Sequence, residues 1–173
     1  MKLKSILNEG IAIGIVLAVG TLFALYFTDV SIRVGTDVGD RAPSFTLTDI
    51  DGKNFSLKDY RGKIVVIDFM AGWCSYCKLE MSHLKEIYSS YSDEEAVILW
   101  IDVDPNESVK TIRSLKEGYG GDWTYARGPE VAATYGVTAI PTLYMLDSEG
   151  KIVYKNVGVT SVSALLSEID EHR

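Results

Sequence analysis

The amino-acid sequence predicts an α/β fold in which a central mixed β-sheet is flanked by helices. Two runs rich in branched apolar residues, 63–69 and 96–103, are typical of strands covered on both faces. Segments with apolar residues at helical spacing alternate with these runs. A hairpin pattern and a last helix close the chain, so we expect both parallel and antiparallel strands in one sheet.

The composition is typical of a globular protein with one domain. Of the 173 residues, 47% are hydrophobic and 24% are charged, and the sequence contains no repeat or low-complexity tract. The net charge is −7; with Lys2, Lys4 and Glu9 giving residues 1–28 a charge of +1, the remainder carries −8. Because a domain of that charge repels phosphate backbones, we expect no nucleic-acid partner.

The N-terminal part is predicted to anchor the protein in a membrane. Residues 10–28 carry no charge and would form a helix of ~28 Å, close to the ~30 Å hydrocarbon core of a bilayer. The alternative is a cleaved signal peptide, but residues 23–28 place bulky side chains where a peptidase needs small ones. Lys2 and Lys4 precede the segment, which favours residues 1–9 in the cytoplasm, a single-pass signal anchor and an extracytoplasmic domain.

A linker and a hairpin are predicted between the anchor and the first buried strand. Residues 29–41 are polar and contain glycine, and they would hold the domain, residues 42–173, near the membrane surface. Residues 45–47 and 55–57 alternate apolar and polar side chains around Asp51-Gly52. This pattern indicates two short antiparallel strands joined by a turn.

The rest of the domain follows as strands and helices in alternation. The helix after strand 63–69 is marked by one apolar stripe at helical spacing, formed by Leu79, Leu84, Ile87, Tyr88 and Tyr91. The remaining predicted elements are a strand over 96–103, a helix over 106–117 ended by glycines, a short helix over 129–135, strands over 142–146 and 151–157, and a last helix capped by Thr160 or Ser161 and ending near His172.

We expect the chemistry of the chain at its two cysteines, Cys74 and Cys77. They directly follow a buried strand and open a helix, whose unpaired N–H groups and dipole stabilise a thiolate. Cysteines of such motifs have pKa values of ~3.5–7.5 instead of ~8.5. Two cysteines this close form no structural disulfide framework. A structural zinc site would need about four ligands, and only His83 and His172 remain.

This placement predicts a redox-active disulfide and therefore an enzyme, a thiol–disulfide oxidoreductase. The thiolate of Cys74 would attack a disulfide of a partner protein and form a mixed disulfide. Cys77, one turn further in and more buried, would then attack Cys74 and release the reduced partner. Trp73 precedes the pair and is a candidate substrate contact. No metal ion or other cofactor is implied by these residues.

Three stretches of the chain carry a family resemblance. They are GDRAPSFTL (39–47) with DG (51–52) and LKDYRGK (57–63), then DFMAGWCSYCKLE (68–80), and finally YGVTAIPT (135–142) with Asp147 and GKIV (150–153). They resemble the N-terminal hairpin, the active site and the C-terminal half of the membrane-anchored TlpA/ResA branch of the thioredoxin superfamily. The resemblance covers roughly residues 38–170 and implies a thioredoxin fold with an N-terminal β-hairpin extension.

The resemblance also implies roles for individual residues. It implies a cis peptide bond at Ile140-Pro141, and Ile140, Pro141 and Thr142 would flank the cysteines and offer backbone groups to a bound substrate chain. Asp68 matches the buried acid that in thioredoxins accepts or relays the proton of the inner cysteine. Glu80 matches a glutamate that the ResA-like branch keeps beside its cysteines. The alternative for both is a plain solvent-exposed carboxylate.

The chain departs from the family pattern near the cysteines. Met70 stands where the family usually has tryptophan, Ser82 where thioredoxins often have proline, and Ser75-Tyr76 is an uncommon dipeptide between the cysteines. Because that dipeptide influences the redox potential, the direction of electron flow is open. It supplies no positive charge to hold a thiolate, and the two nearby carboxylates oppose a second negative charge, which favours a reductant.

The predicted partners are protein thiols and disulfides of exported proteins, with a membrane electron donor. A narrower role in cytochrome c maturation rests on the family resemblance alone. Two alternatives stay open. A peroxiredoxin-like peroxidase would share the Ala-Pro-x-Phe opening of residues 42–45, but its reactive cysteine sits in a Pro/Thr-rich loop that this sequence lacks. A non-enzymatic copper metallochaperone would use both cysteines and a histidine, and the downstream candidate is His172.

Overall fold

The structure is a computed structural model that describes residues 33–92 and 95–173. The predicted cytoplasmic N-terminus and membrane anchor, residues 1–28, lie outside the described residues. Within the described ranges, no helix is long and apolar enough to span a bilayer. Residues 33–173 form one compact unit.

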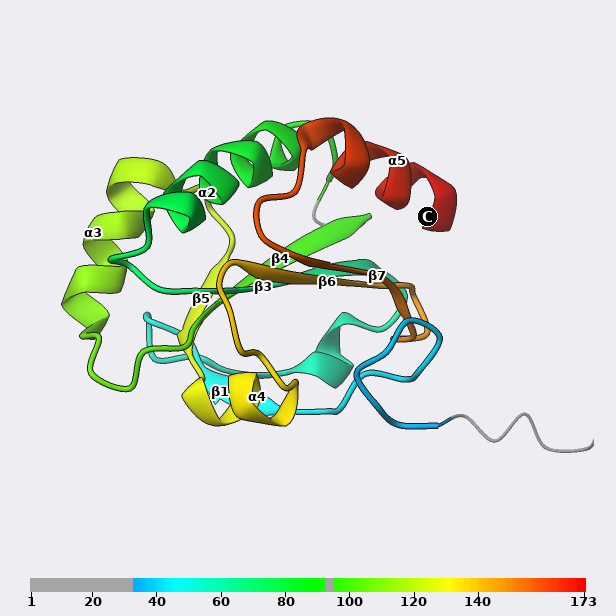
Figure 1. Ribbon diagram of the computed structural model, residues 1–173, viewed down its shortest axis with the longest axis horizontal. Coiled ribbons are helices and arrows are strands. Elements are labelled where there is room, and N and C mark those ends of the chain that lie inside the picture. The colour runs from blue at the N-terminus through cyan, green and yellow to red at the C-terminus, as the bar shows by residue number, and fades with distance from the viewer. Residues whose placement is uncertain (1–32, 93–94) are drawn as a thin grey trace, which may run out of the picture. The chain divides into compact units, whose positions relative to one another are not determined.

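A five-stranded mixed sheet lies at the centre of the domain (Figure 1), which confirms the predicted thioredoxin architecture. The strand order is β5-β4-β3-β6-β7, in which β3, β4 and β5 run parallel and β6 and β7 complete the sheet with antiparallel pairings. The strands are β3 (Ile64–Met70), β4 (Ala96–Asp102), β5 (Thr124–Arg127), β6 (Thr142–Leu146) and β7 (Ile152–Val157). β5 was missed by sequence, because four residues with no apolar run give no periodic pattern.

Alternate side chains of the first central strand, β3, belong to the two halves of the core on opposite faces of the sheet. Successive side chains of a strand point to opposite faces. Val66 and Met70 therefore join the cluster that contains both cysteines, whereas Val65, Ile67 and Phe69 join the cluster on the other face. Asp68 shares the face of Val66 and Met70 and so points toward the cysteine helix.

The hairpin covers one face of the sheet together with a short helix, α4 (Pro129–Thr134) (Figure 1). Its strands, β1 (Thr46–Thr48) and β2 (Asn54–Ser56), pair antiparallel as predicted. The turn uses Gly52 at a positive φ of 85°, and the Asp49 carboxylate accepts the N–H groups of Asp51 and Lys53. A 3-10 turn, η1 (Leu57–Tyr60), follows.

The opposite face is covered by α2 (Ser75–Tyr88) and α5 (Val162–His172), with α3 (Val109–Tyr119) beside α2 (Figure 1). The buried stripe of α2 differs from the predicted one, because Leu79 is 48% exposed and the stripe instead begins at Cys77. α3 starts three residues later than predicted, where the Ser108 hydroxyl caps it. α5 is capped by Ser161, one of the two predicted residues.

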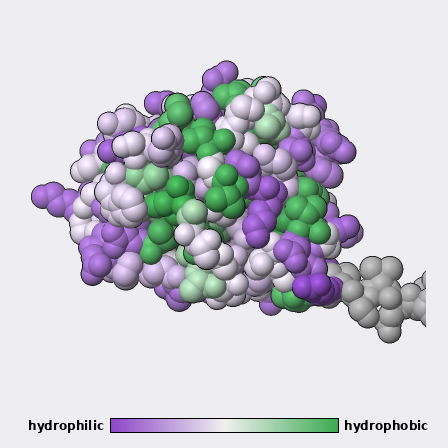
Figure 2. All heavy atoms as spheres, in the orientation of Figure 1, coloured by the Kyte–Doolittle hydropathy of each residue, from purple (hydrophilic) through white to green (hydrophobic). Residues whose placement is uncertain are grey.

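The described end of the predicted linker pairs with the edge of the sheet. Gly39 N–H donates to the Ile152 carbonyl, and Ile152 N–H donates to the Asp40 carbonyl, both at 2.8 Å. Arg41 forms an antiparallel bridge with Lys151. Residues 39–41 therefore lie against the start of β7, and any free tether would have to precede them. Figure 2 shows apolar side chains in several small groups on the visible face, separated by polar ones.

Candidate active site at Cys74 and Cys77

The two cysteines lie where β3 gives way to α2, as the sequence predicts. Cys74 is the N-cap of α2, and its sulfur accepts a hydrogen bond from the Cys77 N–H at 3.1 Å. The two residues form a disulfide, with their Cα atoms 5.2 Å apart. A sulfur at this position faces the unpaired N–H groups and positive dipole end of a 14-residue helix, so negative charge on it is stabilised.

The two cysteines differ in how exposed they are, and exposed apolar side chains lie next to them in the chain. Cys74 is 7% exposed and Cys77 only 1%, which agrees in sense with an outer attacking and an inner resolving cysteine. Trp73, Tyr76 and Leu79 are exposed apolar side chains around the pair, and we call them the apolar rim. A partner chain that docks on this rim would bury apolar area next to the Cys74 sulfur.

Two carboxylates, Asp68 and Glu80, are fully buried next to the cysteine helix. This result excludes the solvent-exposed alternative for both side chains. Within the described residues, neither Asp68 oxygen has a hydrogen-bond partner, and neither has Glu80 Oε1. Glu80 Oε2 accepts the Thr160 N–H at 2.7 Å. Three of the four oxygens are therefore left without a partner in low-dielectric surroundings.

The electrostatics of this pair favour a bound proton. Burial raises the pKa of Asp68 well above its usual value, and the negative charge of Glu80 raises it further. Burial also raises the pKa of Glu80, while the hydrogen bonds from Thr160 and the nearby His83 act in the opposite direction. A carboxyl pair of this kind holds a proton more readily than exposed carboxylates do, and its two members titrate together.

The loop before β6 carries the predicted cis peptide bond between Ile140 and Pro141. Ile140 packs against the core cluster that contains both cysteines. The Pro141 carbonyl already accepts the Gly158 N–H at 2.8 Å. Since proline has no N–H, backbone groups for a substrate chain would come from Ile140 or Thr142.

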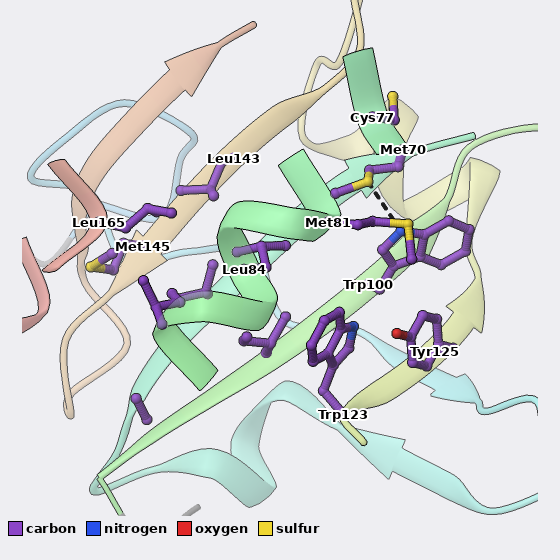
Figure 3. Close-up of a cluster of buried hydrophobic side chains, with 14 of the residues drawn as sticks. Met70, Cys77, Met81, Leu84, Trp100, Trp123, Tyr125, Leu143, Met145 and Leu165 are labelled. Atoms are coloured by element: carbon purple, nitrogen blue, oxygen red, sulfur yellow. Dashed lines mark hydrogen bonds between the residues drawn. The ribbon is translucent and has the colours of Figure 1, made fainter. Parts of the chain in front are cut away.

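At the departure from the family pattern, Met70 contacts a tryptophan from the neighbouring strand. The Trp100 Nε1–H of β4 points at the Met70 sulfur, 3.1 Å away (Figure 3). Figure 3 also places Met81 of α2 next to both side chains, below Cys77. A methionine in the usual tryptophan position therefore leaves no gap, because Trp100 and Met81 fill the space.

A second group of acids beside the motif was missed by sequence analysis. Asp104 accepts the Trp73 Nε1–H at 2.9 Å, and Glu107 accepts the Gly72 N–H at 3.0 Å. Asp102, at the end of β4, is fully buried, and burial raises its pKa to about 6. The sequence did offer a signal, because the acidic run from Asp102 to Glu107 follows the buried strand β4. β4 is parallel to β3, so both strands end at the same edge of the sheet, where the cysteine motif begins.

The histidines lie away from the disulfide sulfurs. Among the described residues, the one group that could hold a metal ion is Glu168, Glu171 and His172 near the end of α5. The metallochaperone alternative needs a histidine beside both cysteines. The Nε2 atom of His172 instead lies 3.8 Å from the Oε2 atom of Glu168. His83 instead contacts the Thr160 carbonyl.

Comparisons with known proteins relate the chain to thiol–disulfide oxidoreductases. The model of the AhpC/TSA family matches residues 38–155. The thiol-disulfide oxidoreductase ResA of Bacillus anthracis is 34% identical over 144 residues, which cover 82% of this chain and 80% of that protein. The thioredoxin-like protein YneN of Bacillus subtilis is 32% identical over 151 residues, 84% of this chain and 86% of that protein.

Two solved structures share the fold over most of their length. The thioredoxin domain of a thiol-disulfide oxidoreductase from Bacteroides vulgatus has a TM-score of 0.67 at 26% identity, covering 76% of this chain and 96% of that one. The exposed lipoprotein thioredoxin of Streptococcus pneumoniae has a TM-score of 0.64 at 29% identity, covering 75% of this chain and 99% of that one.

Proposed function

The chain belongs to the AhpC/TSA family as a thioredoxin-like thiol–disulfide oxidoreductase of the ResA/DsbE type, and we propose that it reduces disulfides of exported proteins from a membrane anchor. One observation carries the proposal: the Cys74 sulfur caps the N-terminus of α2 and is bonded to Cys77, and the same helix carries Glu80, which is buried and interacts with the buried Asp68. The anchor is the uncharged segment 10–28, and residues 29–173 lie outside the cytoplasm.

The reaction starts from the reduced pair. The Cys74 thiolate attacks one sulfur of the partner disulfide, and the other partner sulfur leaves as a thiolate and takes up a proton. Cys77 then loses its proton and attacks the Cys74 sulfur, which breaks the mixed disulfide and releases the second partner thiolate. Two electrons pass to the partner, and Cys74–Cys77 remains as the disulfide. A membrane donor of two electrons restores the dithiol.

The buried carboxyl pair serves the second step. Cys77 is 1% exposed, so water has little access to its thiol proton. Asp68 on β3 and Glu80 on α2 have unused oxygens, and one of the two carboxylates accepts the proton of Cys77 as it attacks. The same carboxyl returns the proton when the disulfide is reduced again.

The direction of electron flow follows from charge. Ser75 and Tyr76 add no positive charge near the Cys74 sulfur, and the carboxyl pair opposes negative charge there. A less stabilised thiolate makes the dithiol a better electron donor. Equilibration with glutathione or dithiothreitol buffers should give a potential on the thioredoxin side of ~−200 mV, and a value above about −160 mV would indicate an oxidase or isomerase instead.

The substrates are proposed to be exported polypeptides with exposed disulfides. The apolar rim of Trp73, Tyr76 and Leu79 suits an unfolded chain with apolar residues near its cysteines. The Streptococcus pneumoniae protein, described as an exposed lipoprotein thioredoxin, sets a precedent for this side of the membrane. Apocytochromes awaiting haem are a narrower substrate class within this proposal.

Trapping in cells tests substrate and location together. A Cys77→Ser variant should accumulate mixed disulfides with exported proteins, and a variant that also carries Cys74→Ser should accumulate none. A membrane-impermeant thiol reagent should label Cys74 in intact, pre-reduced cells. Trapping of cytoplasmic proteins alone, or protection from the reagent, contradicts the proposed side of the membrane. Peroxide turnover retained by Cys77→Ser would favour the peroxidase alternative.

A further inference from the structure

His83 lies one turn beyond Glu80 on α2, half-buried against the loop that joins β7 to α5. Its Nδ1 atom is 2.7 Å from the Thr160 carbonyl oxygen. Because a carbonyl oxygen only accepts, Nδ1 carries the hydrogen of this contact. The histidine is therefore tied to the loop and is no freely rotating surface side chain.

Thr160 links this histidine to the buried carboxyl pair. Its N–H donates to Glu80 Oε2 at 2.7 Å, while its carbonyl accepts from His83. Its hydroxyl accepts from the Asn156 side chain at 3.1 Å, and the residue is only 2% exposed. Thr160 therefore bonds to two side chains of α2, those of Glu80 and His83, and is itself held by Asn156 of β7.

Several acidic groups lie around Glu80, and the charge of His83 opposes their effect on its carboxylate. Asp68 of β3 and Tyr154 of β7 both interact electrostatically with Glu80, and Glu168 of α5 acts on Tyr154. The loop from Gly158 to Ser161 contributes no ionisable side chain. Against these groups, the charge of His83 lowers the pKa of Glu80.

We propose that His83 is a positioning residue for disulfide exchange: its bond to the Thr160 carbonyl holds the Thr160 N–H on the Glu80 carboxylate. The charge of His83 acts in the same direction, since it attracts that carboxylate. The inference rests on the proposed function, in which the carboxyl pair moves the proton of Cys77. A cationic ring strengthens both its bond to the Thr160 carbonyl and its attraction for Glu80.

Two substitutions separate the two parts of this role. In His83→Gln the amide can still donate to the Thr160 carbonyl but carries no charge. In His83→Leu both the donor and the charge are lost. We expect His83→Gln to move the pH–rate profile of disulfide reduction to higher pH, so that exchange is about three- to tenfold slower on the acid side, because Glu80 loses the charge that lowers its pKa. His83→Leu should be slower at every pH. His172→Gln, at the other histidine, is the matched control and should behave as wild type.

A titration that needs no partner disulfide completes the test. In the oxidised protein, carbon NMR of the Glu80 carboxyl should show its midpoint raised by about 0.5–1 pH unit in His83→Gln and unchanged in His172→Gln. In a Glu80→Gln background, His83→Gln should no longer alter the pH dependence of exchange.

The proposal is overturned if the Glu80 midpoint does not move in His83→Gln, or if the acid-side loss persists in the Glu80→Gln background. A wild-type protein that fails to reduce any disulfide would contradict the proposed function instead, and the carboxyl titration would still decide the role of His83. A shared loss of thermal stability in His83→Gln and His172→Gln would also count against it.

Discussion

Two groups of carboxylates flank the cysteine motif, and they differ in what their oxygens do. Asp68 on β3 and Glu80 on α2 are buried, and three of their oxygens have no hydrogen-bond partner among the described residues. Asp104 and Glu107, in the loop after β4, accept hydrogen bonds from Trp73 and Gly72, the two residues before Cys74. The first group is shielded from water, and the second lies at the edge of the sheet.

This difference separates proton transfer from positioning. A buried carboxyl without partners favours its neutral form, so it binds a proton more readily than an exposed carboxyl does and can exchange it. A carboxylate that accepts N–H groups is held ionised; the Asp104 pKa is lowered by the Asn106 N–H and the Trp73 indole. We therefore expect substitutions in the core pair to change the pH dependence of exchange, and substitutions in the loop to change its rate uniformly.

Both groups act through the cysteines, so the largest effect is expected there. Cys74→Ser should abolish exchange, because only the outer sulfur attacks a partner, whereas Cys77→Ser should stop at the mixed disulfide. Alkylation of the reduced protein at neutral pH should modify Cys74 first, measured by mass spectrometry of the peptide. Preferential labelling of Cys77 would reverse the assignment of outer and inner cysteine.

The next largest effect is expected from Asp68→Asn. The amide cannot accept the Cys77 proton, so resolution of the mixed disulfide should slow about ten- to a hundredfold near pH 7. Stopped-flow measurement of partner release from pH 6 to 9 would follow this step. Asp104→Asn is the control from the loop group, and an equal loss in both variants would remove the distinction between the two groups.

Glu80→Gln should have a smaller effect on the rate but a clear one on the pH profile. The glutamine can still accept the Thr160 N–H, so the fold should persist, while the second ionisable group of the pair is lost. We expect exchange about three- to tenfold slower and a shifted titration of the thiols. An unchanged pH–rate profile would assign proton transfer to Asp68 alone.

The sequence predicted the parts of this site that are local in the chain. The strand over 63–69, the cysteines at the helix start and the cis bond before Thr142 all carry short-range patterns or a family motif. The contacts that distinguish the two acid groups join residues far apart in sequence, such as Gly72 with Glu107 and His83 with Thr160. No periodicity encodes such pairs, since the fold creates them by bringing strand ends and loops together.

Leu79 shows a second limit of pattern reasoning. It occupies a helical-spacing position and is apolar, yet it is 48% exposed, while the charged Glu80 next to it is buried. The hydrophobic pattern therefore assigned Leu79 to the wrong environment, and it gave no signal for the burial of Glu80, which only the family resemblance placed beside the cysteines. Both exceptions lie at the candidate active site, where an exposed apolar contact and a buried acid suit the proposed chemistry better than they suit stability.

The smallest effect is expected at Asp102, which belongs to the loop group by position but resembles the core pair by burial. Its Oδ1 accepts the Asp104 N–H at 3.1 Å, and its Oδ2 has no partner within the described residues. Burial raises its pKa from 3.8 to about 6. Folding therefore binds a proton between these values, and the free energy of unfolding falls as pH rises through 6.

Asp102→Asn should remove this penalty without losing the acceptor for Asp104. We expect no gain below pH 3.8, where the carboxyl is protonated in both states, and a gain of about 1 kcal/mol above pH 6. Urea unfolding at pH 3.5 and pH 8 measures the difference. Asp104→Asn should give the opposite sign at pH 8, because that carboxylate is stabilised in its ionised form. If Asp102→Asn instead destabilises the protein at pH 8, the Asp102 carboxylate acts as a positioning group. Asp102 would then belong with Asp104 and Glu107 rather than with the buried pair of Asp68 and Glu80.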